Sequence, residues 1–171
     1  MNLGNSIDVE VLESMVAQGF DMPAVDRFGC NLYWSAQTAE AVQLLLDLGV
    51  SADLVNHAGE TPLFDITDVD IARLYVDAGV NVNHVSKDNE TVLSQTVMYS
   101  SMDVFNVFMS YADRFSVDTI RHAIDENRRY ANMDEYYIDI MLSKLMLESC
   151  SRERALLKAK TSVDNNCILR L

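Results

Sequence analysis

Residues 56–83 read NHAGETPLFDITDVDIARLYVDAGVNVN, and parts of this stretch return at a step of thirty residues. Its turn, Gly-Glu-Thr-Pro-Leu at 59–63, is followed thirty residues later by Asn-Glu-Thr-Val-Leu at 89–93. Thirty residues before it stands Gly-Cys-Asn-Leu-Tyr at 29–33. A short unit written at a fixed period predicts a repeat architecture, because each unit buries its apolar face only against the next one.

An amphipathic segment lies ahead of a glycine in each of these copies. Apolar residues at i, i+1, i+4 and i+5 place one apolar stripe on one face of a helix. The glycine that follows suits a left-handed C-cap, where the absence of a side chain removes the steric cost. The three predicted helices are Val9–Gln18, Ala39–Leu48 and Val69–Ala78, and their glycines are Gly19, Gly49 and Gly79.

The turn at Thr61-Pro62-Leu63 is typical of a helix start. We expect Thr61 to cap the following helix through its hydroxyl, and proline suits the first helical turn because it lacks an N–H. With these residues, the stretch 56–83 resembles an ankyrin repeat, in which a hairpin tip, a Thr-Pro-Leu-His helix start and a second helix ending at glycine recur every ~33 residues. The resemblance covers residues 6–112 and continues more loosely to about 149.

The resemblance implies an all-α solenoid of about four to five helix-turn-helix repeats, with short hairpin-like loops and a helical C-terminal cap. Phe64 stands where the family has histidine, so the hydroxyl-to-histidine bond of the family's turn is not expected. The thirty-residue copies lack the glycine-centred link between the two helices, and their first helices should therefore be short. A fourth copy starts at Asp103, 33 residues after Asp70, and is three residues longer.

These observations predict three parts of the chain. Repeats occupy residues 1–112, followed by a degenerate capping repeat over 113–149 and by a short basic helix and tail over 150–171. The expected copies are about 1–25, 26–55, 56–85 and 86–112. The capping repeat is expected to pair two antiparallel helices, Val117–Arg128 and Met133–Ser149.

Charge is distributed unevenly over this plan. The net charge is −13, and residues 1–112 carry sixteen acidic side chains against three basic ones, whereas residues 113–171 carry ten of each. Such a surface repels nucleic acid and anionic membranes and attracts a basic protein. The alternative that the acidity only keeps the protein soluble stays open.

Motifs of catalysis and of cofactor binding are absent from the sequence. It holds no glycine-rich phosphate loop and no G-x-S-x-G turn, and its three histidines lack an i, i+4 partner. The run Asp65–Asp70 begins like a calcium loop but lacks the glycine and the closing glutamate. We therefore expect no enzymatic activity, no cofactor and no metal site.

The cysteines and the N-terminal residues indicate an intracellular protein. Three cysteines without a C-x-x-C pair favour reduced thiols, and neither a signal peptide nor an apolar run of ~20 residues is present. We expect a cytoplasmic location and no membrane contact.

The resemblance also implies a binding surface, along the concave side formed by hairpin tips and first helices. The alternative is that these residues are only the polar outside of a solenoid. For Trp34, an interface anchor and burial against the previous copy are both open. The candidate binding residues are Arg27, Phe28, His57, Glu60, Asp65, Asp68, Lys87, Asp88, Glu90 and Tyr99.

The expected function is therefore protein–protein interaction without catalysis. The specific hypothesis is a small inhibitor, such as an immunity protein or a phage-type anti-defence protein, whose acidic concave face covers a basic protein. The alternative is an adaptor that tethers its partner without inhibiting it. Self-association through the terminal copies also stays open.

Overall fold

The computed structural model describes residues 7–22, 24–99, 102–129, 135–147, 150, 151 and 154. Its contacts divide the chain into two units, Met1–Met133 and Asp134–Leu171. The described residues of the first unit form an α-helical repeat solenoid with two isolated β-bridges, Ile7 with Ala36 and Val85 with Thr91. No helix among the described residues combines the length and the apolarity needed to cross a membrane.

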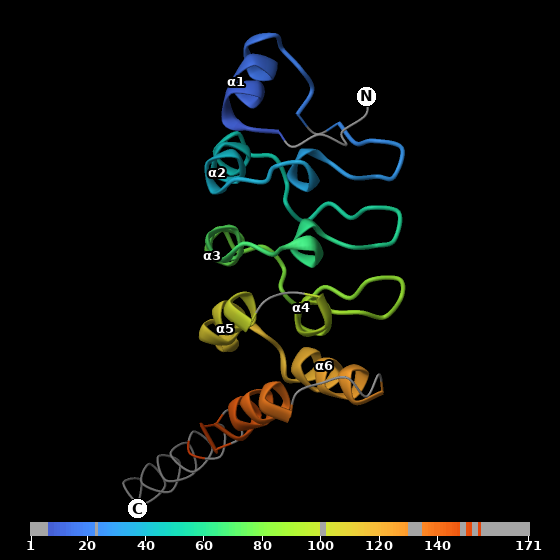
Figure 1. The fold of residues 1–171 in the computed structure, drawn as a ribbon, viewed down its shortest axis with the longest axis vertical. Helices are drawn as coiled ribbons and strands as arrows, with labels where there is room; N and C mark the ends of the chain where they lie inside the picture. Colours follow the sequence, from blue (N-terminus) through green and yellow to red (C-terminus); the bar gives the residue numbers. More distant parts are fainter. Residues whose placement is uncertain are drawn as a thin grey trace, which may run out of the picture. The chain divides into compact units, whose positions relative to one another are not determined.

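The helices of the first unit form two columns, with hairpin loops projecting beyond the second column (Figure 1). Neighbouring helices of each column pack on one another: α1 on α2, α2 on α3 and α3 on α5 in one, η1 on η2, η2 on α4 and α4 on α6 in the other. The first column contains α1 (Val9–Ala17), α2 (Ala39–Asp47), α3 (Val69–Asp77) and α5 (Met102–Ser110). The second contains the 3-10 helices η1 (Leu32–Trp34) and η2 (Pro62–Asp65), then α4 (Val92–Tyr99) and α6 (Val117–Arg129), with η3 (Ala112–Arg114) between α5 and α6.

The first-column helices start and stop where the sequence predicts. Asp8, Thr38 and Asp68 cap their N-termini by accepting hydrogen bonds from backbone N–H groups of the first turn. The glycines that follow the helices have φ angles of 73°, 73° and 82°, as the C-cap prediction requires. The predicted helix ends differ from the observed ones by one residue, so the predicted period is confirmed.

The short first helices are also confirmed. Copies of thirty residues have only the 3-10 turns η1 and η2, whereas the fourth copy, with three more residues, forms the full helix α4. Trp34 is the last residue of η1 and is half-buried.

The predicted Thr61 cap is wrong. Thr61 precedes η2 but makes no capping bond, and its buried Oγ1 has no hydrogen-bond partner. The neighbouring copies do cap their helices: the Asn31 side chain accepts from the N–H of Tyr33, and Thr91 and Ser94 each accept from the other's N–H. Phe64, which replaces the family's histidine, brings no polar group to Thr61.

Two tyrosines whose rings are tilted by 60° to one another connect the columns in the second and third copies. The rings of Tyr33 and Tyr75 lie 5.5 Å apart and are nearly fully buried, and the Tyr33 hydroxyl donates to the Val50 carbonyl at 2.9 Å. Burial raises the pKa of Tyr33 to about 12. Burial and then the neighbouring Tyr33 raise the pKa of Tyr75 as well. Both phenols are therefore protonated at neutral pH.

Replacing Tyr33 by phenylalanine is expected to lower the free energy of unfolding by about 0.5–1.5 kcal/mol, because one buried hydrogen bond is lost. An unfolded tyrosine ionises near about pH 10, and the folded Tyr33 near about 12. The stability that the neutral phenol contributes is therefore complete below about pH 10 and is lost as pH rises towards about 12. Urea unfolding at pH 7 to 11 should show a shallower alkaline decline for Tyr33→Phe than for the wild type. The exposed Tyr99→Phe is the control, and an equal change there would contradict the argument.

The hairpins stack directly on one another through their backbones. Each hairpin is closed by a backbone bond of 2.9 Å, from Asp26 to Cys30, from Asn56 to Glu60 and from Ser86 to Glu90. Successive hairpins are joined because the N–H of His57 donates to the Phe28 carbonyl at 2.8 Å, and that of Lys87 to the Ala58 carbonyl at 3.0 Å. The thirty-residue period thus brings equivalent hairpin atoms together.

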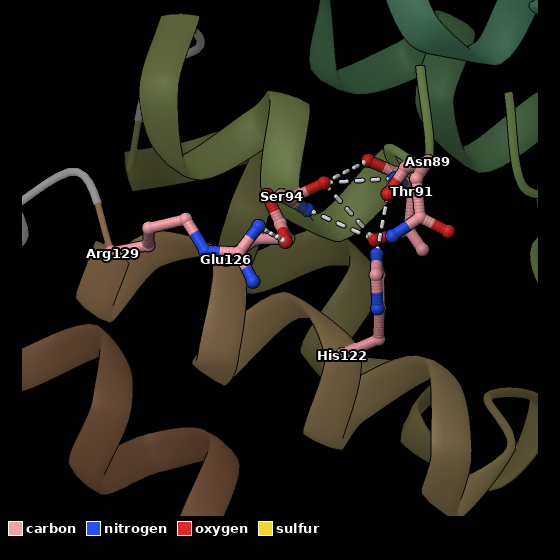
Figure 2. A network of polar contacts seen from close by, with 6 residues as sticks. All are labelled: Asn89, Thr91, Ser94, His122, Glu126 and Arg129. Carbon is pink, nitrogen blue, oxygen red and sulfur yellow. Dashed lines mark hydrogen bonds and ion pairs between the residues drawn. The ribbon is translucent and has the colours of Figure 1, made fainter. Parts of the chain in front are cut away.

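Helix α6 ends this stack. It packs on α4, and its Ile120, Ala123 and Ile124 are buried. Figure 2 shows the polar contacts at this junction, where His122 Nε2 bonds to the carbonyl of Asn89 in the third hairpin. The buried Glu126 carboxylate pairs with the exposed Arg129 guanidinium at 2.8 Å. A helix therefore takes the place of a further hairpin at this end.

Of the second unit, residues 135–147 are helical and lie within the predicted helix Met133–Ser149. The rings of Tyr136 and Tyr137 lie 6.4 Å apart in its first turns. Most of the basic helix and tail predicted for 150–171 lies outside the described residues.

Candidate protein-binding surface

The predicted hairpin-tip residues are exposed and follow one another along the stacked hairpins. We call Arg27, Phe28, His57, Lys87 and Asp88 the hairpin edge. The Arg27 guanidinium lies 4.7 Å from the centre of the Phe28 ring, which remains 55% exposed. Lys87 donates from Nζ to the His57 carbonyl at 2.9 Å. The edge thus offers one aromatic ring and mixed charges on a rigid backbone.

Two of the predicted carboxylates serve the hairpins themselves. Glu60 is half-buried and accepts a hydrogen bond of 2.8 Å from the Asn56 side chain. Glu90 is half-buried and accepts from the Gln95 amide at the start of α4. The first contact lies within the second hairpin and the second joins the third hairpin to α4, so both side chains have a structural role that the sequence did not predict.

A groove of about 540 Å³ lies between the second and third copies. Its exposed rim has Gln37, Asp65, Thr67 and Asp68, and its half-buried wall is Trp34. Buried side chains complete the lining: Tyr33, Ala36, Pro62, Ile66, Ile71 and Tyr75. The accessible surface of the groove is therefore more polar than apolar, with carboxylates at its edge.

The two groove carboxylates differ in how far they are engaged. Asp68 caps α3, and its Oδ1 accepts from the N–H groups of Asp70 and Ile71 at 2.9 and 3.0 Å. Asp65 ends η2, is exposed, and forms no hydrogen bond or ion pair within the described part of the chain. Of the two groove carboxylates, Asp65 is therefore the one that no hydrogen bond of the described chain engages.

The other candidates do not belong to the groove. Tyr99 ends α4 and is 70% exposed, but it is not part of the groove lining. Cys30 is half-buried in the first hairpin; burial and the carboxylates of Asp26 and Asp65 raise the pKa of its thiol, which keeps it protonated. Among the described residues, no group of three or more histidine, cysteine or acidic side chains is placed to hold a metal ion.

Sequence reasoning missed two surface features. Gln37 and Thr67 join the groove only because the links between first and second helices of adjacent copies come together. Val25, Val55 and Val85 are exposed one residue before each hairpin and form a valine ladder. The ladder could have been predicted from the sequence, because valine occurs at three positions thirty residues apart. The groove had no such signal, because its residues come from 33–37 and 62–75.

The geometry defines the class as an α-helical repeat protein with an acidic, partly apolar groove. No protein-family model matches the sequence. A protein of Acanthamoeba polyphaga mimivirus named "Putative ankyrin repeat protein L371" is 30% identical over 88 residues, which is 49% of this chain and 11% of that protein. The chain thus spans about a tenth of the length of this relative.

A solved structure also has this fold. It is the predatory endopeptidase Bd0816 from Bdellovibrio bacteriovorus in complex with immunity protein Bd3460, and a chain of it matches with a TM-score of 0.60 at 20% identity. The match covers 79% of this chain and 74% of that chain. At this identity the likeness concerns the fold alone, which is an α-helical repeat solenoid.

Proposed function

We propose that the chain is an ankyrin-type binding module, without catalytic activity, that recognises a basic protein in the cytoplasm. Its binding surface consists of the groove between the second and third copies together with the hairpin edge. The observation that carries this proposal is Asp65, an exposed carboxylate without a partner in the described chain, beside the wall of Trp34. Tryptophan is one of the residue types that most often dominate binding energy at protein interfaces.

The distribution of charge supports a basic partner. The repeats of residues 1–112 carry the whole excess of negative charge, sixteen acidic against three basic residues. Such a field raises the rate of encounter with a positively charged protein and repels nucleic acid. The same field disfavours a second copy of this chain as the partner.

The specific role that we propose is inhibition, as by an immunity protein or an anti-defence protein. One support is the ankyrin resemblance of residues 56–83, which accords with the mimivirus relative. Another is that the solved structure of this fold is a complex of an endopeptidase with an immunity protein. A role as an adaptor is the second candidate, favoured by the valine ladder, an exposed apolar surface that leaves the groove free.

Reversing the charge of Asp65 and Asp88 to lysine is expected to slow association with the partner severalfold and to flatten its salt dependence. These positions leave the structural carboxylates of Asp68, Glu60 and Glu90 intact. The partner is first captured from native lysate by the tagged wild type and identified by mass spectrometry. Association rates of purified variants are then measured at low and at physiological salt.

The matched control is Asp47→Lys with Asp77→Lys. It changes the net charge equally, and both residues end first-column helices, where a cation is favourable to the helix dipole. Equal association rates for the two double variants would refute the acidic-face proposal. An activity assay of the captured partner then decides between inhibitor, which lowers its rate, and adaptor, which does not.

A further inference from the structure

We propose that the groove receives an arginine side chain of the partner protein, with its guanidinium between Trp34 and Asp65. This inference rests on the proposed function and names the group that the groove recognises. It starts from three properties of the groove: its size, the composition of its lining, and the charge at its rim.

The size and the mixed, mainly polar lining of the groove fit a long side chain with a polar head and a short apolar stem. A volume of about 540 Å³ exceeds that of a single side chain and leaves space for the backbone that carries it. Pro62, Ile71 and Ala36 contribute to the smaller, apolar part of the lining, and the Tyr33 hydroxyl is already bonded to Val50. The methylene groups of arginine are suited to this apolar part, while its charged head stays near the exposed rim.

The rim selects for a cation. Asp65 lies at the edge of the groove and has no hydrogen-bond or ion-pair partner in the described chain. Asp68 caps α3 with Oδ1 only, so its second carboxylate oxygen takes no part in the cap. Within the described residues, no basic side chain lines the groove. Because the lining has carboxylates and no cation, an entering group of positive charge is complementary to it.

Trp34 favours arginine over lysine. A planar guanidinium stacks on an indole face and at the same time donates two parallel hydrogen bonds to a carboxylate. Ammonium is a compact and strongly hydrated charge, which gains less from such a wall. The same chain shows this pairing on its surface, where the Arg27 guanidinium lies over the Phe28 ring.

The test uses Trp34 as a local probe, because it is the sole tryptophan of the chain. The whole protein is titrated with the blocked peptide acetyl-Gly-Arg-Gly-amide, and the indole N–H signal of Trp34 is followed by nuclear magnetic resonance. We expect a saturable shift with a Kd of about 1 mM, the weak affinity of a single side chain. The lysine peptide should bind at least about twofold more weakly and the glutamine peptide not measurably.

Asp65→Asn is expected to weaken the binding of the arginine peptide by about two- to fivefold, the range that one exposed ion pair contributes. Asp77→Asn removes the same charge from the first-column helix α3 and should leave the Kd unchanged. Equal binding of lysine and arginine peptides, equal effects of the two variants, or no saturable shift would each overturn the arginine assignment. The proposed function is judged separately, since the Asp65→Lys/Asp88→Lys double variant is measured against the whole partner.

Discussion

Phe108→Ala is expected to lower the free energy of unfolding by about 3–5 kcal/mol, the cost of truncating a large aromatic in a packed core. Phe108 is fully buried in α5, which packs on both α3 and α4. Its ring also contacts Phe115 edge to face, with centroids 6.0 Å apart. Because a small domain is stable by only about 5–15 kcal/mol, this single change removes a large fraction of the total.

The measurement is urea unfolding followed by far-ultraviolet circular dichroism. Phe28→Ala is the matched control, since it is the same chemical change at a ring that is more than half exposed. We expect that control to change stability by no more than about 0.5 kcal/mol. Similar losses for the two variants would mean that the fourth repeat is not packed as described.

Gly59→Ala is expected to lower the free energy of unfolding by about 2–5 kcal/mol, the second largest of the effects predicted for this protein. Gly59 has φ +78°, a conformation that costs a residue with a side chain about 1–2 kcal/mol. A Cβ at this position would also lie 2.9 Å from Lys87 Cγ and 3.1 Å from the Lys87 backbone nitrogen. The next hairpin must therefore move away, which adds an overpacking cost of about 1–3 kcal/mol.

Gly79→Ala separates these two costs. Its φ of +82° is nearly the same, but a Cβ there has no neighbour within 4 Å. This variant should lose only about 1–2 kcal/mol, the conformational part. Equal losses at positions 59 and 79 in urea unfolding would show that the hairpins are not in close contact. In the third hairpin, the position equivalent to Gly59 is Asn89, which has a side chain and a φ of +64°. This hairpin is the last before α6, so no further hairpin packs against that side chain, in agreement with the argument.

Much of the fold was predictable because its signals are local. The helices of the first column follow from a stripe of apolar residues and a terminal glycine, and their bounds are confirmed within one residue. The shortness of η1 and η2 followed from the thirty-residue period. The predicted capping bond of Thr61 was wrong because such a bond depends on the local turn geometry and on competing partners, which residue type alone does not specify.

The candidate surface was likewise predictable only in part. The exposure of Phe28 and His57 was predictable from their places at hairpin tips, where the chain turns towards solvent. The internal hydrogen bonds of Glu60, Glu90 and Asp68 were not predictable. The sequence shows an acidic residue at each position but does not show whether its side chain binds a neighbouring residue or a partner.

The sequence by itself determined the repeat, its period, the helix ends and the confinement of the excess negative charge to residues 1–112, since each is a property of residues near one another in the chain. Only the tertiary structure decided which carboxylates remain available and where a groove forms. The physical reason is that Trp34 and Asp65, thirty-one positions apart, become neighbours only when the second copy stacks on the third. Stacking brings η1 against η2 and leaves a groove whose lining comes from both copies.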